Sequence, residues 1–196
     1  MSGLLNKFNE FKSIVNYRFV YDLEDGQIID FKIKQKDFPH LVGLHKLIDI
    51  PIIRYFNDKN NQTVSAKYII SQIKKQNILT ETIIRKSSYF SQIEQRYNNF
   101  TKDNLLSLSY TDVVVDFDKT IFGSQINAQY IFFEEQKIQE YNHLCVAEDI
   151  NKEQYAESFF YEPSDLYLRN QQKIKIKKLT IYDEKGNIFL EDILIP

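Results

Sequence analysis

Two of the three histidines in the chain, His40 and His45, lie in the short segment Phe-Pro-His-Leu-Val-Gly-Leu-His-Lys-Leu, together with Lys46. Proline fixes its own φ near about −65° and disfavours a helical conformation for the residue before it, so Pro39 restrains the backbone beside His40. Histidine is the side chain best suited to proton transfer near neutral pH. The segment is therefore the first candidate for acid–base chemistry or phosphate contact.

A metal site and a purely structural role are the other interpretations of the two histidines. Their spacing places them roughly 140° apart around a helix, and on opposite faces of a strand. Neither arrangement forms a shared local site, and only His143 and Cys145 remain as further His or Cys ligands. We predict no metal and no cofactor. Partly buried histidines held by backbone hydrogen bonds are the structural alternative.

A second candidate is the apolar stretch Val113–Ile121, which contains Asp116 and Asp118. It resembles the strand and Asp-x-Asp-x-Thr motif of haloacid-dehalogenase-like phosphatases. That resemblance implies Asp116 as nucleophile, Asp118 as general acid and a bridging Mg²⁺. The family also needs a parallel sheet with crossover helices, whereas the chain that follows is typical of short antiparallel strands. A strand that ends in an acidic turn is the simpler interpretation.

A third candidate begins at Ser158 and continues past Pro163 through Tyr167 to Arg169. The planar guanidinium of Arg169 is suited to clamp a phosphate, and the hydroxyls of Ser158 and Tyr167 can orient an oxygen. A short helix capped by Ser164 is an equally good interpretation.

Lysine and isoleucine alternate in a late predicted strand. Lys173, Lys175 and Lys177 share one face, and Ile174 and Ile176 share the other. Such a lysine stripe can follow a phosphate backbone. More often it keeps a strand edge solvated and prevents aggregation.

The composition indicates a globular protein with one core. The chain has 196 residues, of which 43% are hydrophobic and 14% aromatic, and it shows neither a repeat nor a Gly/Pro/Ser-rich linker. We therefore predict a single domain spanning 1–196. A net charge of −2 argues against coating nucleic acid through global charge, although a local basic patch remains compatible with it.

The single cysteine, Cys145, rules out an intramolecular disulfide and predicts a reducing compartment. The first residues lack a leader pattern, and no stretch of the sequence approaches a membrane-spanning length. We expect a cytoplasmic protein without a membrane partner.

Local patterns predict the secondary structure. Apolar residues at helical spacing indicate helices near 4–15, 66–73 (with Thr63 as cap), 89–100 (behind Ser87 or Ser88) and 105–108. Alternation predicts strands at 17–23 and 29–34, with a turn at Asp25-Gly26. Segments rich in Tyr, Phe, Val and Ile, separated by polar turns, predict strands at 110–117, 128–133, 140–147, 155–161, 173–182 and 188–194. We predict an α+β fold: an antiparallel sheet with helices packed mainly on one face, in which an N-terminal helix and β-hairpin precede a helical segment and a C-terminal strand meander.

The order of these parts resembles the phage-associated barnase/EndoU/colicin/RelE-like nuclease domains, in particular the PBECR4 group. Residues 38–43 resemble that group's Phe-x-His-Leu-x-Gly segment, and residues 116–121 resemble its Asp-aromatic-Asp-Lys turn. Residues 158–171 resemble its late strand and Tyr/Arg/Gln turn. The resemblance covers nearly the whole chain.

The resemblance implies a metal-independent ribonuclease-like domain in which a 2′-hydroxyl attacks its own phosphate, with RNA as partner. It also implies that His40 and Arg169 face one cleft. The implied roles are base or acid for His40, a second proton carrier for His45, charge stabilisation for Arg169 and Lys46, and positioning of oxygens for Ser158 and Tyr167.

A non-catalytic phage-type inhibitor that binds a host defence protein is the alternative from a different class. Its acidic side chains would occupy the nucleic-acid groove of that partner. The candidate acidic residues are Glu134, Glu135, Glu140, Glu148 and Asp149.

Overall fold

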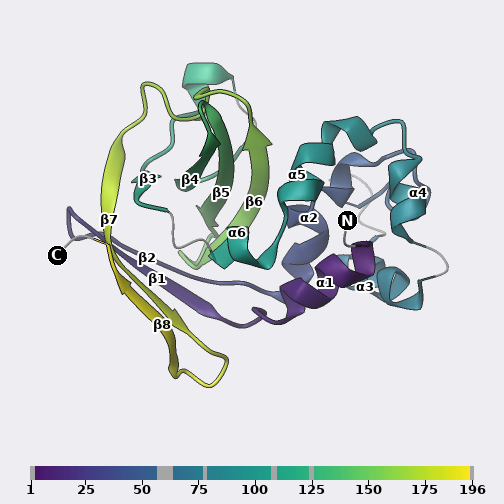
Figure 1. The fold of residues 1–196 in the computed structure, drawn as a ribbon, viewed down its shortest axis with the longest axis horizontal. Coiled ribbons are helices and arrows are strands. Elements are labelled where there is room, and N and C mark those ends of the chain that lie inside the picture. The colour runs from purple at the N-terminus through teal and green to yellow at the C-terminus, as the bar shows by residue number, and fades with distance from the viewer. Residues whose placement is uncertain (1–2, 57–63, 77–78, 107–109, 124–125, 195–196) are drawn as a thin grey trace.

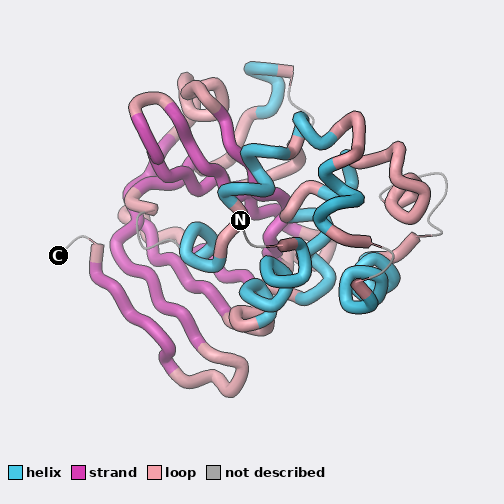
Figure 2. Tube along the Cα trace, turned by 45° about the vertical axis from the view of Figure 1, so that its right-hand side comes forward, coloured by secondary structure: helices cyan, strands magenta, loops and turns pink. Residues whose placement is uncertain are grey.

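A computed structural model describes residues 3–56, 64–76, 79–106, 110–123 and 126–194 (Figure 1). Strands gather in one part of the molecule and most helices in the other (Figure 2). The strands are β1 Arg18–Leu23, β2 Ile28–Lys32, β3 Asp112–Val114, β4 Tyr130–Lys137, β5 Glu140–Glu148, β6 Gln154–Glu162, β7 Lys173–Tyr182 and β8 Ile188–Ile193. The α-helices are α1 Leu4–Lys12, α2 Phe38–Leu41, α3 Ala66–Lys75, α4 Glu81–Arg85, α5 Glu94–Asn99 and α6 Lys102–Leu106. Short 3-10 helices are η1 Gln35–Asp37, η2 Leu44–Lys46, η3 Phe90–Gln92 and η4 Lys119–Phe122.

Seven of the described strands form a closed mixed barrel in the order β1-β2-β6-β5-β4-β3-β7, and β7 pairs back onto β1. The pairing of Phe19 with Ile181 belongs to this closure. β2 meets β6 in parallel, through Phe31 and Gln154, and β8 adds to β7 outside the ring. The predicted open antiparallel sheet with helices mainly on one face is therefore wrong. Alternation within each strand specifies which side chains face inward, but it carries no information on how distant strands pair.

The local predictions agree better with the structure. β7 has the predicted bounds, and the hairpin of β1 and β2 turns at Asp25-Gly26. α3 begins after Ser65, whose Oγ accepts a hydrogen bond from the Tyr68 N–H, whereas the predicted cap Thr63 lies outside the described residues. The helix predicted over 89–100 is divided at Ile93 into η3 and α5.

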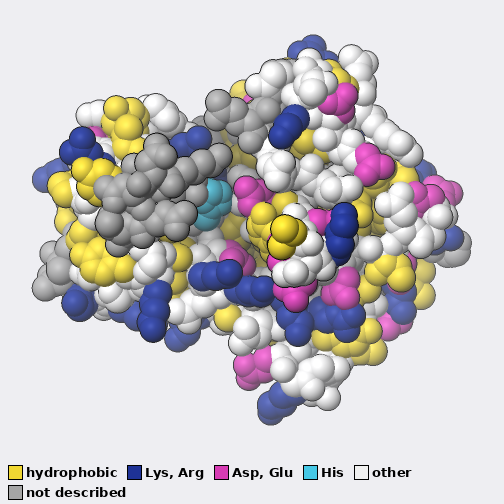
Figure 3. Space-filling view, turned by 180° about the vertical axis from the view of Figure 1, so that it is seen from behind, with side chains coloured by type: hydrophobic (Ala, Val, Ile, Leu, Met, Phe, Trp, Pro, Cys, Tyr) yellow, Lys and Arg dark blue, Asp and Glu magenta, His cyan; other side chains and the backbone are white. Residues whose placement is uncertain are grey.

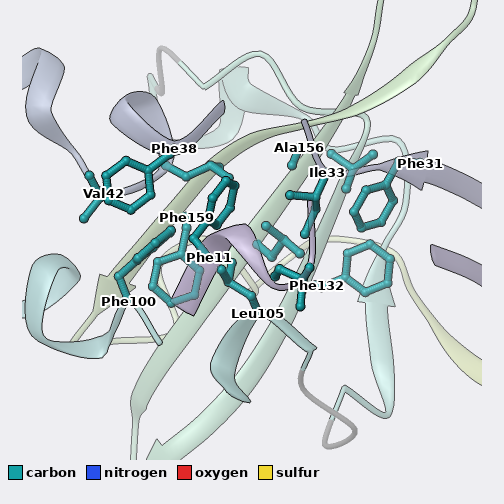
Figure 4. Packing of buried hydrophobic residues seen from close by; sticks show 14 of the residues in the cluster. Phe11, Phe31, Ile33, Phe38, Val42, Phe100, Leu105, Phe132, Ala156 and Phe159 are labelled. Carbon is teal, nitrogen blue, oxygen red and sulfur yellow. The ribbon is translucent and has the colours of Figure 1, made fainter. Parts of the chain in front are cut away.

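One hydrophobic cluster continues from the barrel interior into the helical part. α2 and α5 pack against β6, where the aromatic rings of both parts meet (Figure 4). The Phe100 ring lies 5.7 Å from that of Phe38 and 5.7 Å from that of Phe159. Burial of such rings is the main stabilising term of a fold of this size. It also fixes α2 and α5 against β6, and these elements carry the candidate site.

The single domain over 1–196 stays a prediction.

A second, smaller cluster lies on the other face of β3, β4 and β5, around Cys145 and Leu168. The turn that follows β6 covers this face with Leu168 and Tyr167. His143 packs here at 0% exposure, with its ring 4.7 Å from that of Phe160, and neither ring nitrogen has a hydrogen-bond partner among the described residues. Burial lowers the pKa of His143 from 6.5 to about 3, so the folded protein holds this ring neutral.

We expect His143→Phe to make the protein less sensitive to acid. The unfolded chain takes up a proton at this histidine below about pH 6.5, whereas the folded chain does not, so stability is lost as the pH falls from there toward 3. At about pH 5, the protonation of His143 in the unfolded chain lowers the free energy of unfolding by about 2 kcal/mol. Denaturant titrations near pH 8 and about pH 5 measure it, and a variant that loses stability as steeply as the wild type contradicts the prediction.

Candidate functional site

The two histidines of the Pro-Gly segment lie against each other. His40 lies in the last turn of the short helix α2, Gly43 adopts a left-handed conformation with φ of 92°, and His45 follows in η2. The two imidazole rings are stacked, with centroids 4.1 Å apart and planes inclined by 10°. The spacing rules for a regular helix or strand separate these rings, but here they meet, because the segment is neither: Gly43, in its left-handed conformation, stands between α2 and η2.

Glycine is required at position 43 for two reasons. A side chain is strained at a φ of this sign. A Cβ at this position would also lie 3.0 Å from Cδ of Arg96 and 3.1 Å from Cγ2 of Ile93. Close contact between Gly43 and α5 therefore brings Arg96 to the histidine pair.

Arg96 holds the backbone of α2 and links it to the barrel. Its Nε donates to the Leu41 carbonyl at 2.8 Å, and its Nη2 donates to the His40 carbonyl at 2.7 Å. Nη2 also lies 3.4 Å from Oγ of Ser158 on β6. Arg96 is only 8% exposed and forms no salt bridge with any described residue. A buried cation without a carboxylate partner creates a positive potential at the site.

Arg96 was not among the residues predicted from the sequence, although a signal was present. Arg96 follows Ile93 by three positions and precedes Phe100 by four, so it occupies the apolar face of the predicted helix. A charged side chain at such a position needs polar partners in the interior, and here they are two carbonyls and a serine.

Both imidazoles are neutral at neutral pH. Burial, followed by the positive charges of Arg96 and Lys46, lowers the pKa of His40 to about 4. The pKa of His45 falls further for the same reasons, and a proton on His40 lowers it again. Burial also lowers the pKa of Arg96, to about 10, which leaves the guanidinium charged. The site thus combines two proton acceptors with a fixed positive charge.

A cavity of about 870 Å³ opens beside the pair. Figure 3 shows histidine surface on one face of the molecule, with Lys and Arg side chains around it. Because His143 is fully buried, this surface belongs to the stacked pair. The polar and aromatic residues that line the cavity are His45, Lys46, Asp49, Arg54, Tyr55, Phe56 and Tyr89.

A family model described as phage-Barnase-EndoU-ColicinE5/D-RelE like nuclease 4, PBECR4, matches residues 4–193. The chain belongs to the PBECR4 family. The resemblance seen in the sequence is confirmed, and with it a nuclease-like function in a phage-associated family that suggests nucleic-acid binding. Comparison with curated proteins and with solved structures gives no match for this PBECR4 chain. None of its described helices has the length and apolar character needed to cross a membrane.

The candidates Ser158, Tyr167 and Arg169 of this PBECR4 chain lie on β6 and in the turn that follows it. Ser158 contacts Arg96, and Phe160, two residues later, faces the same side of β6. Tyr167 packs on that Phe160 ring at 4.9 Å. The Arg169 side chain is exposed in the turn after β6, and the backbone N–H of Arg169 donates to the Asp165 carbonyl. A common cleft for His40 and Arg169 stays a prediction.

The helix predicted after Ser164 is a series of turns. Oγ of Ser164 accepts a weak hydrogen bond from the Leu166 N–H, at 3.3 Å, but no helix follows. On β7 the predicted lysine stripe is confirmed as a structural feature, because Lys173, Lys175 and Lys177 are all exposed while Ile176 is buried. Whether the stripe binds nucleic acid stays a prediction.

The aspartate motif of this PBECR4 chain does not lie in a phosphatase-like sheet. β3 pairs antiparallel with both β4 and β7, whereas the haloacid-dehalogenase-like fold needs parallel strands. Asp118 accepts hydrogen bonds from the N–H and Oγ1 of Thr120, and Asp116 accepts one from Gln129, as in an acidic turn. Within the described ranges, no group of three or more His, Cys, Asp or Glu side chains could hold a metal ion.

Proposed function

We propose that this PBECR4 protein is a metal-independent ribonuclease that cleaves RNA phosphodiesters by acid–base catalysis at His40 and His45. The observation that carries the proposal is the stack of two imidazoles on a backbone that is held by the buried Arg96, a cation with no carboxylate partner among the described residues. Family membership supports the nuclease class. The chemistry of the histidine pair favours RNA as the substrate. Proton transfer alone suffices for cleavage when the substrate supplies its own 2′-hydroxyl nucleophile.

The proposed step is an intramolecular transesterification at one phosphate of the RNA. One imidazole takes the proton of the 2′-hydroxyl while the 2′-oxygen attacks phosphorus. The bond from phosphorus to the 5′-oxygen breaks, and the leaving oxygen takes a proton from the other imidazole, which enters the step as an imidazolium after taking a proton from solvent. The products are a 2′,3′-cyclic phosphate and a 5′-hydroxyl.

The stack favours one acid and one base. The negative phosphate raises the pKa of both imidazoles when it binds. A proton on His40 lowers the pKa of His45, so the pair holds one proton more readily than two. We assign the role of base or acid to His40 and the role of second proton carrier to His45.

Other residues position the pair and the RNA. Arg96 is a positioning residue that holds the His40 backbone and contributes positive charge. Ser158 in turn orients Arg96. Lys46 is exposed at the cavity and is proposed to contact a phosphate. Exposure of Arg169 supports a contact with the RNA backbone, whereas the packed Tyr167 supports only a structural role nearby.

The test is incubation of the purified protein with an RNA oligonucleotide in EDTA. We expect fragments that end in 2′,3′-cyclic phosphate and begin with 5′-hydroxyl, identified by mass spectrometry. The same oligonucleotide with a 2′-deoxynucleotide at each cleavage position is the matched control and stays intact. Equal cleavage of DNA, or cleavage only after Mg²⁺ is added, contradicts the proposal. Intact RNA in every condition also contradicts it and leaves the inhibitor alternative to be tested.

A further inference from the structure

An apolar groove of about 320 Å³ adjoins the cavity of the histidine pair. Its lining residues are Pro51, Ile52, Val64 and Tyr68. Pro51 also lines the larger cavity, so the two hollows share a rim. Tyr68 is 44% exposed. The groove is therefore open to solvent and offers apolar surface to a side chain that comes from outside.

The part of the chain that carries the groove is basic. Residues 35–106 contain eleven Lys or Arg and six Asp or Glu residues, whereas the whole chain has a net charge of −2. Lys67 directly precedes Tyr68 and is exposed, and Arg54 is exposed in the neighbouring cavity. Asp49 is the acidic residue in the lining of that cavity. A partner that fits this surface combines an apolar side chain with negative charge.

The chain itself has such a feature in the turn between β5 and β6. Ile150 at the tip of this turn is 96% exposed, the largest fraction among the large hydrophobic residues that the structure describes. Residues 140–165 contain seven Asp or Glu residues and one Lys. Glu153 is 72% exposed, with Lys34 4.0 Å away. The turn thus presents an apolar tip with acidic side chains around it.

The conformation of this turn is fixed by its own hydrogen bonds. Oδ1 of Asp149 accepts from the backbone N–H of Asn151 at 2.7 Å and from that of Glu153 at 3.0 Å. A turn held in this way loses little conformational entropy on binding. Because Ile150 is almost fully exposed, it does not contact the groove of its own chain. The turn and the groove can therefore meet only between two copies.

We infer that this protein self-associates by inserting Ile150 of one copy between Pro51 and Tyr68 of a second copy. The acidic turn around Ile150 then faces Lys67 and Arg54 of that copy, so the charges are opposite. Burial of the isoleucine supplies the apolar part of the contact. The same contact made in both directions closes a dimer with twofold symmetry. Each contact is small, and we expect a dissociation constant in the micromolar range.

Sedimentation equilibrium of the full chain over a range of concentrations tests the inference. We expect a monomer–dimer equilibrium that weakens at least about threefold between about 0.05 M and about 0.5 M salt. Ile150→Asp and Tyr68→Asp should each weaken it at least about tenfold. Ile138→Asp is the matched control, because Ile138 is 90% exposed in the other hairpin turn, between β4 and β5, and this variant should associate like the wild type.

A mixture of the two interface variants separates a contact of turn and groove from a general effect of added charge. Ile150→Asp keeps an intact groove and Tyr68→Asp keeps an intact turn, so the two should bind each other more tightly than either binds itself. A fluorescent label on one of them measures this. A wild type that stays monomeric up to roughly 500 µM overturns the inference. Association that survives both substitutions, or a mixture that gains nothing, also overturns it. None of these outcomes depends on RNA cleavage.

Discussion

His40→Ala is expected to lower the rate of RNA cleavage by about 10²- to 10⁴-fold, the range typical for loss of a general acid or base. The physical reason is that the variant removes one of the two proposed proton carriers, at a position where Arg96 Nη2 fixes the backbone by donating to the His40 carbonyl. Initial rates on one RNA oligonucleotide in EDTA measure the loss. His45→Ala is expected to cost less, because the second proton can also come from water.

The matched control is substitution of the third histidine. His143→Phe removes an imidazole of the smaller cluster, where it packs against Phe160 and not against His40. The variant should cleave RNA at the wild-type rate. If His40→Ala retains wild-type activity, or if His143→Phe loses as much as His40→Ala, the assignment of His40 as base or acid is wrong.

The sequence predicted the strands well because each strand carries its own pattern. Lysine and isoleucine alternate from Lys173 to Lys177, and β7 begins at Lys173. Barrel closure depends instead on pairs such as Phe19 with Ile181, which are far apart in the chain and leave no local signature. The parallel contact of β2 with β6 is equally non-local. Local alternation therefore gave the strands but not the barrel.

The site shows the same division. The Pro-Gly segment could be found from its residue types, but the stack of His40 on His45 depends on the left-handed conformation of Gly43 and on its contact with α5. Spacing rules for regular helices and strands do not apply to such a turn. Arg96 lies far from the histidines in sequence, and only the tertiary fold brings its guanidinium to their backbone.

Arg96→Met is expected to lower the free energy of unfolding by about 2–6 kcal/mol, because the carbonyls of His40 and Leu41 lose their donor at about 1–3 kcal/mol each. The similar size of methionine avoids a large cavity. Denaturant titration measures the loss. The exposed Arg54→Ala is the control and is expected to stay within about 0.5 kcal/mol of the wild type.

Stability alone does not separate a positioning role from simple packing, but the pKa of His40 does. The positive charge of Arg96 lowers that pKa, so Arg96→Met should raise it and Arg96→Lys, which keeps the charge, should leave it closer to the wild-type value. Nuclear magnetic resonance titration of the His40 ring measures its pKa in both variants. The acid limb of the pH profile of RNA cleavage should move to higher pH in Arg96→Met alone. A His40 pKa that is the same in the wild type and in Arg96→Met shows that Arg96 acts on the fold only, and the fixed positive charge would then have no part in the chemistry.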